Sequence, residues 1–143
     1  MERGHDRIIF LPDEFLAHNT ARNVGMPFFL AKRGAAEAAA PARCIIGWDA
    51  RCEVHERFTV EDVANVRRQV PGVTVLAHPE CSPEVIDVVD YAGSTKQMIE
   101  WIARNEADKL LLLTECSMGD NVAAEYPERE MVRLCSIRCP HMN

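Results

Sequence analysis

The chain has 143 residues, with 16 lysines and arginines against 22 aspartates and glutamates, and its formal net charge is −6. This acidic balance argues against nucleic acid or an anionic membrane as a partner, because such partners require a clustered basic surface. No apolar run approaches the roughly 20 residues of a membrane span, and the first residues lack the basic-then-apolar pattern of a signal peptide. We therefore expect a soluble cytoplasmic protein with one sizeable core or two small ones.

Strands and helices are predicted to alternate in the first half of the chain. The apolar run 7–12 indicates a buried strand that stops at its proline. A helix is predicted over 15–24, with Asp13 as its N-terminal cap and Gly25 in the segment that stops it. Two further strands are predicted at 28–30 and 44–48, with an inserted surface segment at 32–43 between them.

The same alternation continues to residue 114. A capping-box pattern at Thr59 begins a helix whose valines share one face. Ser82 caps a short helix, and Ser94 or Thr95 caps a third one. Strands are predicted at 73–77 and 109–114. The leucine run of the second strand requires a sheet centre covered on both faces. Strands separated by helices of this length predict parallel βαβ units and the α/β fold class.

Reactive side chains follow the predicted strands and so gather at one edge of the sheet, where ligands of open parallel sheets bind. The residues in this position are Cys52, His78, Pro79, Glu80, Cys81, Thr114, Glu115 and Cys116. His78 and Glu80 place an imidazole and a carboxylate in one hydrogen-bonding neighbourhood, which suits proton transfer. His55 is either a residue that supports such a site or an ordinary loop histidine.

Six cysteines are many for a cytoplasmic chain of this length, and they indicate metal binding or catalysis rather than disulfides. Cys44 is expected in the core, whereas Cys116 and Cys135 are open between packing and function. The run from Cys135 to Pro140 is a short iron–sulfur-like pattern, and the paired signature of structural zinc is absent. The turn 93–95 either caps a helix or holds a carboxylate or phosphate.

Five motifs occur in the order and approximate spacing of one known family. They are Leu11-Pro12-Asp13, the run 52–59 (Cys-Glu-Val-His-Glu-Arg-Phe-Thr), His78-Pro79-Glu80-Cys81, Gly93-Ser94-Thr95, and Cys139-Pro140 with the three residues that follow. On these motifs the chain resembles the quinolinate synthase A family over nearly its whole length. The segment 114–121 resembles one branch of that family.

The resemblance implies an enzyme of NAD biosynthesis that uses a 4Fe-4S cluster. It would condense iminoaspartate with dihydroxyacetone phosphate to quinolinate, releasing phosphate and water. The resemblance assigns Cys52 and Cys139 as metal ligands, His78 and Glu80 as catalytic residues, and His78, Pro79, Glu80 and Thr95 as substrate-binding residues. The third cysteine ligand is expected outside this chain, and Cys81 and Cys116 match no ligand position. An L-aspartate oxidase or dehydrogenase that supplies iminoaspartate is an expected partner.

The resemblance also predicts a domain organisation. In the family, three similar three-layer α/β domains stand in pseudo-threefold arrangement around the cluster. Residues 1–89, with the insertion 32–43, match the second domain, and residues 90–143 match an incomplete third domain. An interface left open in this way favours self-association or a complementing chain. The alternative functions are a non-catalytic metal-binding remnant and a phosphate-ester-binding protein that uses the turn 93–95.

Overall fold

The computed structural model describes residues 5–32, 40–134 and 139. The chain forms two compact units, residues 1–52 and residues 53–143. Each unit contains a sheet, and every strand pair of both sheets is parallel within the described residues. The predicted α/β fold class with parallel βαβ units is therefore confirmed.

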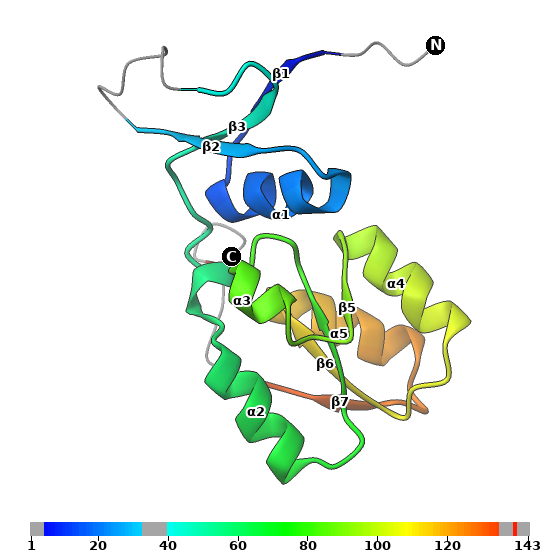
Figure 1. The fold of residues 1–143 in the computed structure, drawn as a ribbon. Helices are drawn as coiled ribbons and strands as arrows, with labels where there is room; N and C mark the ends of the chain where they lie inside the picture. Colours follow the sequence, from blue (N-terminus) through cyan, green and yellow to red (C-terminus); the bar gives the residue numbers. More distant parts are fainter. Residues whose placement is uncertain (1–4, 33–39, 135–138, 140–143) are drawn as a thin grey trace. The chain divides into compact units, whose positions relative to one another are not determined.

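In its described part, the first unit is a three-stranded sheet with one helix (Figure 1). Its elements are β1 (Arg7–Phe10), α1 (Glu14–Val24), β2 (Phe28–Ala31) and β3 (Cys44–Trp48), and the strand order is β1-β3-β2. Asp13 caps α1 by accepting a hydrogen bond from the backbone N–H of Leu16, and Gly25 ends the helix with a φ of 66°. Glycine adopts this left-handed conformation without steric cost, so the predicted start and stop are both confirmed.

The helix α1 packs closely on one face of this sheet. The core cluster consists of Ala17, Ala21 and Ile45, flanked by Phe10, Met26 and Phe28. At Gly47 on β3, a Cβ atom would lie 2.6 Å from Cε2 of Phe28 and 3.1 Å from Cβ of Ala17. The Phe28 ring of the neighbouring strand, together with Ala17 of α1, therefore leaves no room for a side chain at this position.

Gly47→Ala is accordingly expected to lower the free energy of unfolding by about 1–3 kcal/mol, because the new methyl group overpacks the core. Urea denaturation measures this change. The matched control is Gly119→Ala, since a Cβ at Gly119 would meet nothing within 4 Å and the residue lies inside a helix. That control is expected to stabilise by up to about 1 kcal/mol. Equal effects of the two substitutions would contradict the packing argument.

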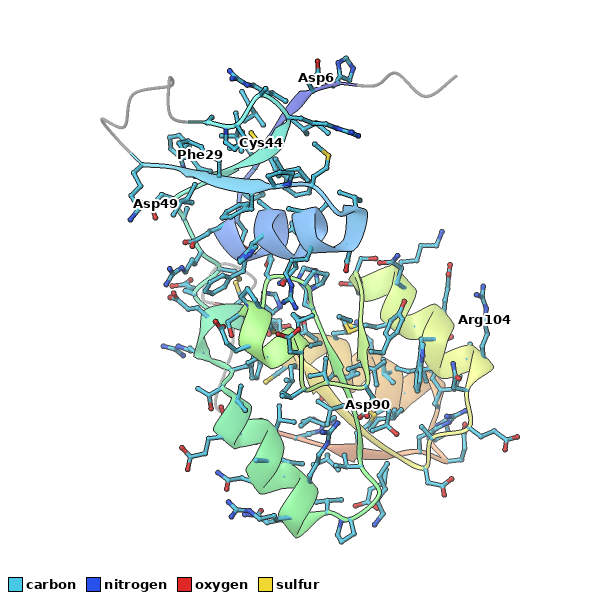
Figure 2. All side chains as sticks on the ribbon, viewed as in Figure 1. Asp6, Phe29, Cys44, Asp49, Asp90 and Arg104 are labelled. Atoms are coloured by element: carbon cyan, nitrogen blue, oxygen red, sulfur yellow. The ribbon has the colours of Figure 1, made fainter. Side chains whose placement is uncertain are left out.

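The opposite face of this sheet is open in the described residues. The strand β1 is exposed along most of its length, and Ile9 is 73% exposed. Phe29 points away from α1 (Figure 2), and with Ile9, Ile46 and Trp48 it lines a cavity of about 430 Å³. The prediction of a buried first strand was therefore wrong in its burial. Apolar content reveals a strand, but β1 lies at the sheet edge, where one face has no described cover.

The second unit has a four-stranded sheet of order β5-β4-β6-β7. Its elements are the 3-10 helix η2 (His55–Arg57), α2 (Val60–Gln69), β4 (Thr74–Ala77), α3 (Pro83–Ile86), β5 (Tyr91–Ala92), α4 (Thr95–Arg104), β6 (Lys109–Leu113), α5 (Cys116–Glu125) and β7 (Glu130–Val132). Thr59 forms the predicted capping box at the start of α2, and Ser82 caps α3. Asp90 joins neighbouring elements, because its carboxylate accepts hydrogen bonds from the backbone of Val75 and from Arg67.

Both faces of this second sheet are buried. One face forms a cluster of Leu76, Leu110 and Leu112 with Met98 and Ile102 of α4 and Met118 and Val122 of α5. The alternate residues Val75, Leu111 and Leu113 point to the other face and are also fully buried. The helices α2 and α3 lie on that side (Figure 1), and they bury Val63, Val66 and Val85. The predicted burial of the leucine run on both faces is confirmed.

Four described elements of the second unit were absent from the sequence prediction, namely η2, β5, α5 and β7. None of the helices in the described residues is long and apolar enough to cross a membrane. The division into domains 1–89 and 90–143 stays a prediction, although strands on both sides of residue 90 share the second sheet. Most of the predicted insertion, residues 33–39, lies outside the described residues.

Candidate active site

A pocket of about 400 Å³ lies at the carboxyl ends of the two inner strands of the second unit. His78 follows β4 directly, and Thr114 follows β6. The wall consists of His55, His78, Glu80, Thr95, Ile99, Thr114, Glu115, Ser117, Met118 and Asn121. Parallel strands bring residues that are distant in the sequence to one sheet edge. The predicted gathering of the His78–Glu80 segment with Thr114 and Glu115 is therefore confirmed.

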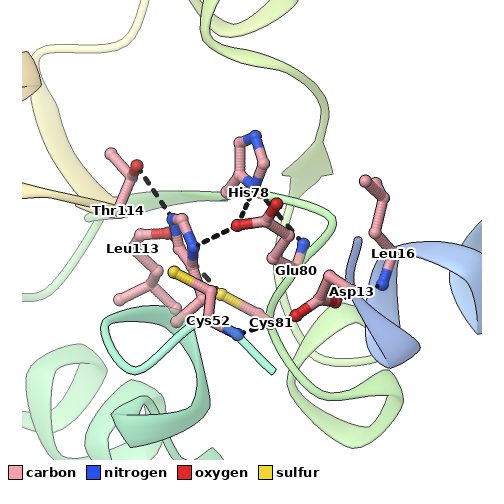
Figure 3. A network of polar contacts seen from close by, with 9 residues as sticks. Asp13, Leu16, Cys52, His78, Glu80, Cys81, Leu113 and Thr114 are labelled. Carbon is pink, nitrogen blue, oxygen red and sulfur yellow. Dashed lines mark hydrogen bonds and ion pairs between the residues drawn. The ribbon is translucent and has the colours of Figure 1, made fainter. Parts of the chain in front are cut away.

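His55 joins the two strand ends. Its ring is buried, and Nδ1 lies 2.8 Å from Oε2 of Glu80. Its Nε2 lies 3.1 Å from Oγ1 of Thr114, and Figure 3 shows these polar contacts. When Nδ1 carries the proton, Nε2 accepts the Thr114 hydroxyl hydrogen, so the ring is held from both sides. The structure thus makes His55 a supporting residue of the pocket, one of the two possibilities left by the sequence.

His78 stacks on His55, with ring centroids 4.5 Å apart and planes inclined by 20°. Its Nδ1 accepts a hydrogen bond from the backbone N–H of Glu80 at 3.3 Å and lies 3.6 Å from Oε2 of the same residue. Burial first, and then the neighbouring His55, lower the pKa of His78 below its ordinary value of 6.5, whereas Glu80 acts in the opposite direction. The neutral ring with an accepting Nδ1 carries its proton on Nε2.

This lowered pKa predicts that the protein loses stability in mild acid. The unfolded chain takes up a proton on His78 at a higher pH than the folded chain does, so the free energy of unfolding falls as the pH drops below about 6.5 and levels off beneath the folded pKa. Urea denaturation between about pH 7.5 and about pH 5 measures this slope. In His78→Gln the slope should be smaller, and an unchanged slope would contradict the assignment.

Thr95 is the first residue of α4 and enters the pocket wall from the end of β5. Ser94 caps the helix in a capping box with Gln97, so the cap is Ser94 rather than Thr95. Gly93 is required before it, because a Cβ there would lie 2.9 Å from both Cβ of Gln97 and Cε1 of Tyr91. Pro79, the remaining predicted substrate residue, is half-buried but is not part of the described pocket wall.

Ser117, Met118 and Asn121 complete the pocket wall from α5. Sequence reasoning did not select them, because no helix was predicted at 116–125. Their segment nevertheless carried a signal, since it is the stretch that resembles one branch of the family. Glu115 caps α5 by accepting a hydrogen bond from the backbone N–H of Ser117 at 2.8 Å, and this cap presents the helix start to the pocket.

The cysteines have different surroundings. Cys44 is fully buried and donates to the carbonyl of Pro41, which confirms its predicted place in the core. Cys81 is also buried, and its thiol donates to the carbonyl of Leu113. Cys116 begins α5 and lines a smaller cavity.

Cys52 and Cys139 are half-buried, and their assignment as metal ligands stays a prediction. Cys135 lies outside the described residues.

Comparison with known proteins assigns this chain to a family. The family model described as "Quinolinate synthetase A protein" matches residues 1–143. Quinolinate synthase 1 of Mesorhizobium japonicum is 47% identical over 139 residues, which cover 97% of this chain and 37% of the relative. Quinolinate synthase of Agrobacterium fabrum is 43% identical over 97% of this chain and 35% of the relative, and that of Caulobacter vibrioides is 42% identical over 99% and 34%. This chain spans about a third of the length of these relatives. It belongs to the quinolinate synthetase A family.

Proposed function

We propose that this chain contributes the proton-transfer pocket of a quinolinate synthase, which condenses iminoaspartate with dihydroxyacetone phosphate to quinolinate in NAD biosynthesis. The observation that carries the proposal is the arrangement of Glu80, whose carboxylate is 2.8 Å from His55 and 3.6 Å from His78 in a pocket at a sheet edge. Carboxylate and imidazole held together in this way suit general acid–base chemistry. Family membership supplies the reaction to which this chemistry is assigned.

We assign separate roles to four predicted site residues. The Glu80 carboxylate accepts a proton from the carbon atom of iminoaspartate that acts as the nucleophile, and it returns the proton to the hydroxyl group that leaves as water, because a carboxylate oriented by His55 is a positioned base. The neutral His78 donates a hydrogen bond from Nε2 to a substrate oxygen, since its Nδ1 is engaged by the Glu80 backbone. Thr95 offers a hydroxyl at the start of α4, where anionic groups of small acids are favoured. Pro79 keeps the turn between the two reactive residues rigid.

Thiolates are the donors that iron–sulfur clusters take, and Cys52 and Cys139 are both half-buried. The thiol groups of this chain therefore fit a 4Fe-4S cluster. Cys52 and Cys139 would supply two of its ligands, and the part of the relatives that this chain does not match would supply the third. When bound, the cluster would supply a Lewis acid for a substrate oxygen.

The proposed reaction implies further partners. Iminoaspartate would come from an L-aspartate oxidase or dehydrogenase, and a cytoplasmic location suits an iron–sulfur enzyme and its small-molecule substrates. The open sheet face of the first unit, with Ile9 exposed, supports the proposed self-association or binding to a complementing chain. A monodisperse monomer in sedimentation would contradict this part of the proposal.

The decisive experiment measures quinolinate. The chain is reconstituted with iron and sulfide without oxygen and assayed alone and with the remaining part of the Mesorhizobium japonicum relative as a separate polypeptide. Product in either mixture supports the proposal, and no product in both refutes it. Zinc bound at a fixed stoichiometry, without the broad visible absorption of a cluster, would instead favour the alternative of a non-catalytic metal-binding module.

A further inference from the structure

The side chain of Asp13 connects two segments of the first unit that are 39 residues apart in the sequence. It is 2% exposed, and its two oxygens have different donors. Oδ1 accepts a hydrogen bond from the backbone N–H of Leu16 at 2.7 Å, which caps α1. Oδ2 accepts a hydrogen bond from the backbone N–H of Cys52 at 2.8 Å (Figure 3). One buried carboxylate thus holds both the helix start and the backbone of the cysteine.

The neighbouring residues continue this connection, and we call the set the α1 clasp. Its members are Asp13, Glu14 and Phe15 at the start of α1 and Ala50, Arg51 and Cys52 after β3. The backbone N–H of Glu14 donates to the carbonyl of Ala50 at 2.8 Å. The Glu14 carboxylate also pairs with Nε of Arg51 at 3.0 Å, and the Arg51 guanidinium lies 4.6 Å from the centroid of the Phe15 ring. Three consecutive residues that end in Cys52 are therefore fixed by the start of one helix.

Capping alone does not account for an aspartate at this position. A helix cap needs one side-chain oxygen, and serine or asparagine provides it as well as aspartate does. Burying a carboxylate is costly unless both oxygens find donors. The second oxygen at Asp13 is directed to the cysteine backbone, so the residue does more than start α1.

We propose that Asp13 is a positioning residue for Cys52, which fixes the backbone of the cysteine and so presets its thiolate for iron. The inference rests on the proposed function, which makes Cys52 a ligand of the cluster. Ligands fixed before the metal arrives lose less conformational entropy on binding it, and partners beyond the ligands themselves tune metal affinity in this way.

Asp13→Ser tests the inference, because serine keeps an oxygen for the Leu16 N–H but has none for Cys52. Amide hydrogen exchange of the reconstituted and the metal-free chain is followed by mass spectrometry at both residues, and iron release to a chelator by visible absorption. We expect Cys52 exchange and iron release to be about tenfold faster, with Leu16 protection retained. Thr59→Ala is the control, since it removes the cap of α2 in the other unit. Asp13→Asn repeats the test with a side chain of the same shape that has only one accepting oxygen.

The outcomes separate this inference from the proposed function. Unchanged Cys52 exchange in both Asp13 variants overturns the positioning role. Faster Cys52 exchange combined with iron release no faster than in Thr59→Ala overturns it as well. If Cys52→Ala loses iron and Asp13→Ser retains it, the proposed function stands and only the positioning role of Asp13 is refuted. Iron fully retained by Cys52→Ala, or never taken up by the unsubstituted chain, refutes the ligand role and the inference with it.

Discussion

Replacing Glu80 by glutamine is expected to lower the rate of quinolinate formation by a factor of about 10²–10⁴, the usual contribution of a positioned acid or base. Glutamine keeps the shape of the side chain and its place in the pocket, but it neither takes up nor releases a proton at neutral pH. The measurement is the initial rate of the reconstituted chain together with the remaining part of the Mesorhizobium japonicum relative. The Michaelis constants should change far less than the turnover number, because the substitution removes an interaction of the transition state.

Glu84→Gln provides the matched control for this substitution. Glu84 is exposed in the first turn of α3, four residues along the chain, and the change of charge is the same. Its rate should remain within about twofold of the unsubstituted chain, as is usual for a surface residue away from the chemistry. Equal rates for Glu80→Gln and Glu84→Gln would remove Glu80 from proton transfer and leave the pocket with a binding role.

The candidate site was largely predictable because it depends on order along the chain. In a parallel βαβ arrangement the residues after successive strands meet at one edge, so His78, Glu80 and Thr114 had to converge once their strands were recognised. His55 follows no strand directly. Its contacts with Glu80 and Thr114 arise from the path of the loop after β3, and local sequence does not encode such a path.

The elements missed by sequence analysis lack a strong local pattern. The helix α5 contains Gly119 together with aspartate and asparagine, which are weak helix formers, and its burial of Met118 and Val122 against the sheet stabilises it. The strand β7 has three residues and forms by pairing with β6. The exposure of β1 was not predicted for a different reason. An apolar run has the same sequence pattern at the centre and at the edge of a sheet.

Leu110→Ala is expected to lower the free energy of unfolding of the second unit by about 2–5 kcal/mol, a large part of the 5–15 kcal/mol that stabilises a typical domain. Leu110 is fully buried on the inner strand β6, in the cluster that joins α4 and α5 to the sheet. Its truncation leaves a cavity that strands held by neighbours on both sides cannot close. Leu110→Met is the control, and because it conserves volume it should cost less than about 1.5 kcal/mol.

The two tryptophans of the chain allow this loss to be assigned to a unit. Trp101 packs against the Leu110 cluster, whereas Trp48 ends β3 of the first unit. In a Trp48→Phe background, urea denaturation followed by fluorescence reports the second unit alone, and its midpoint should shift with Leu110→Ala. In a Trp101→Phe background the midpoint should stay unchanged if the units unfold independently, and an equal shift there would show that they unfold as one cooperative system. No shift at Trp101 would contradict the central place given to Leu110.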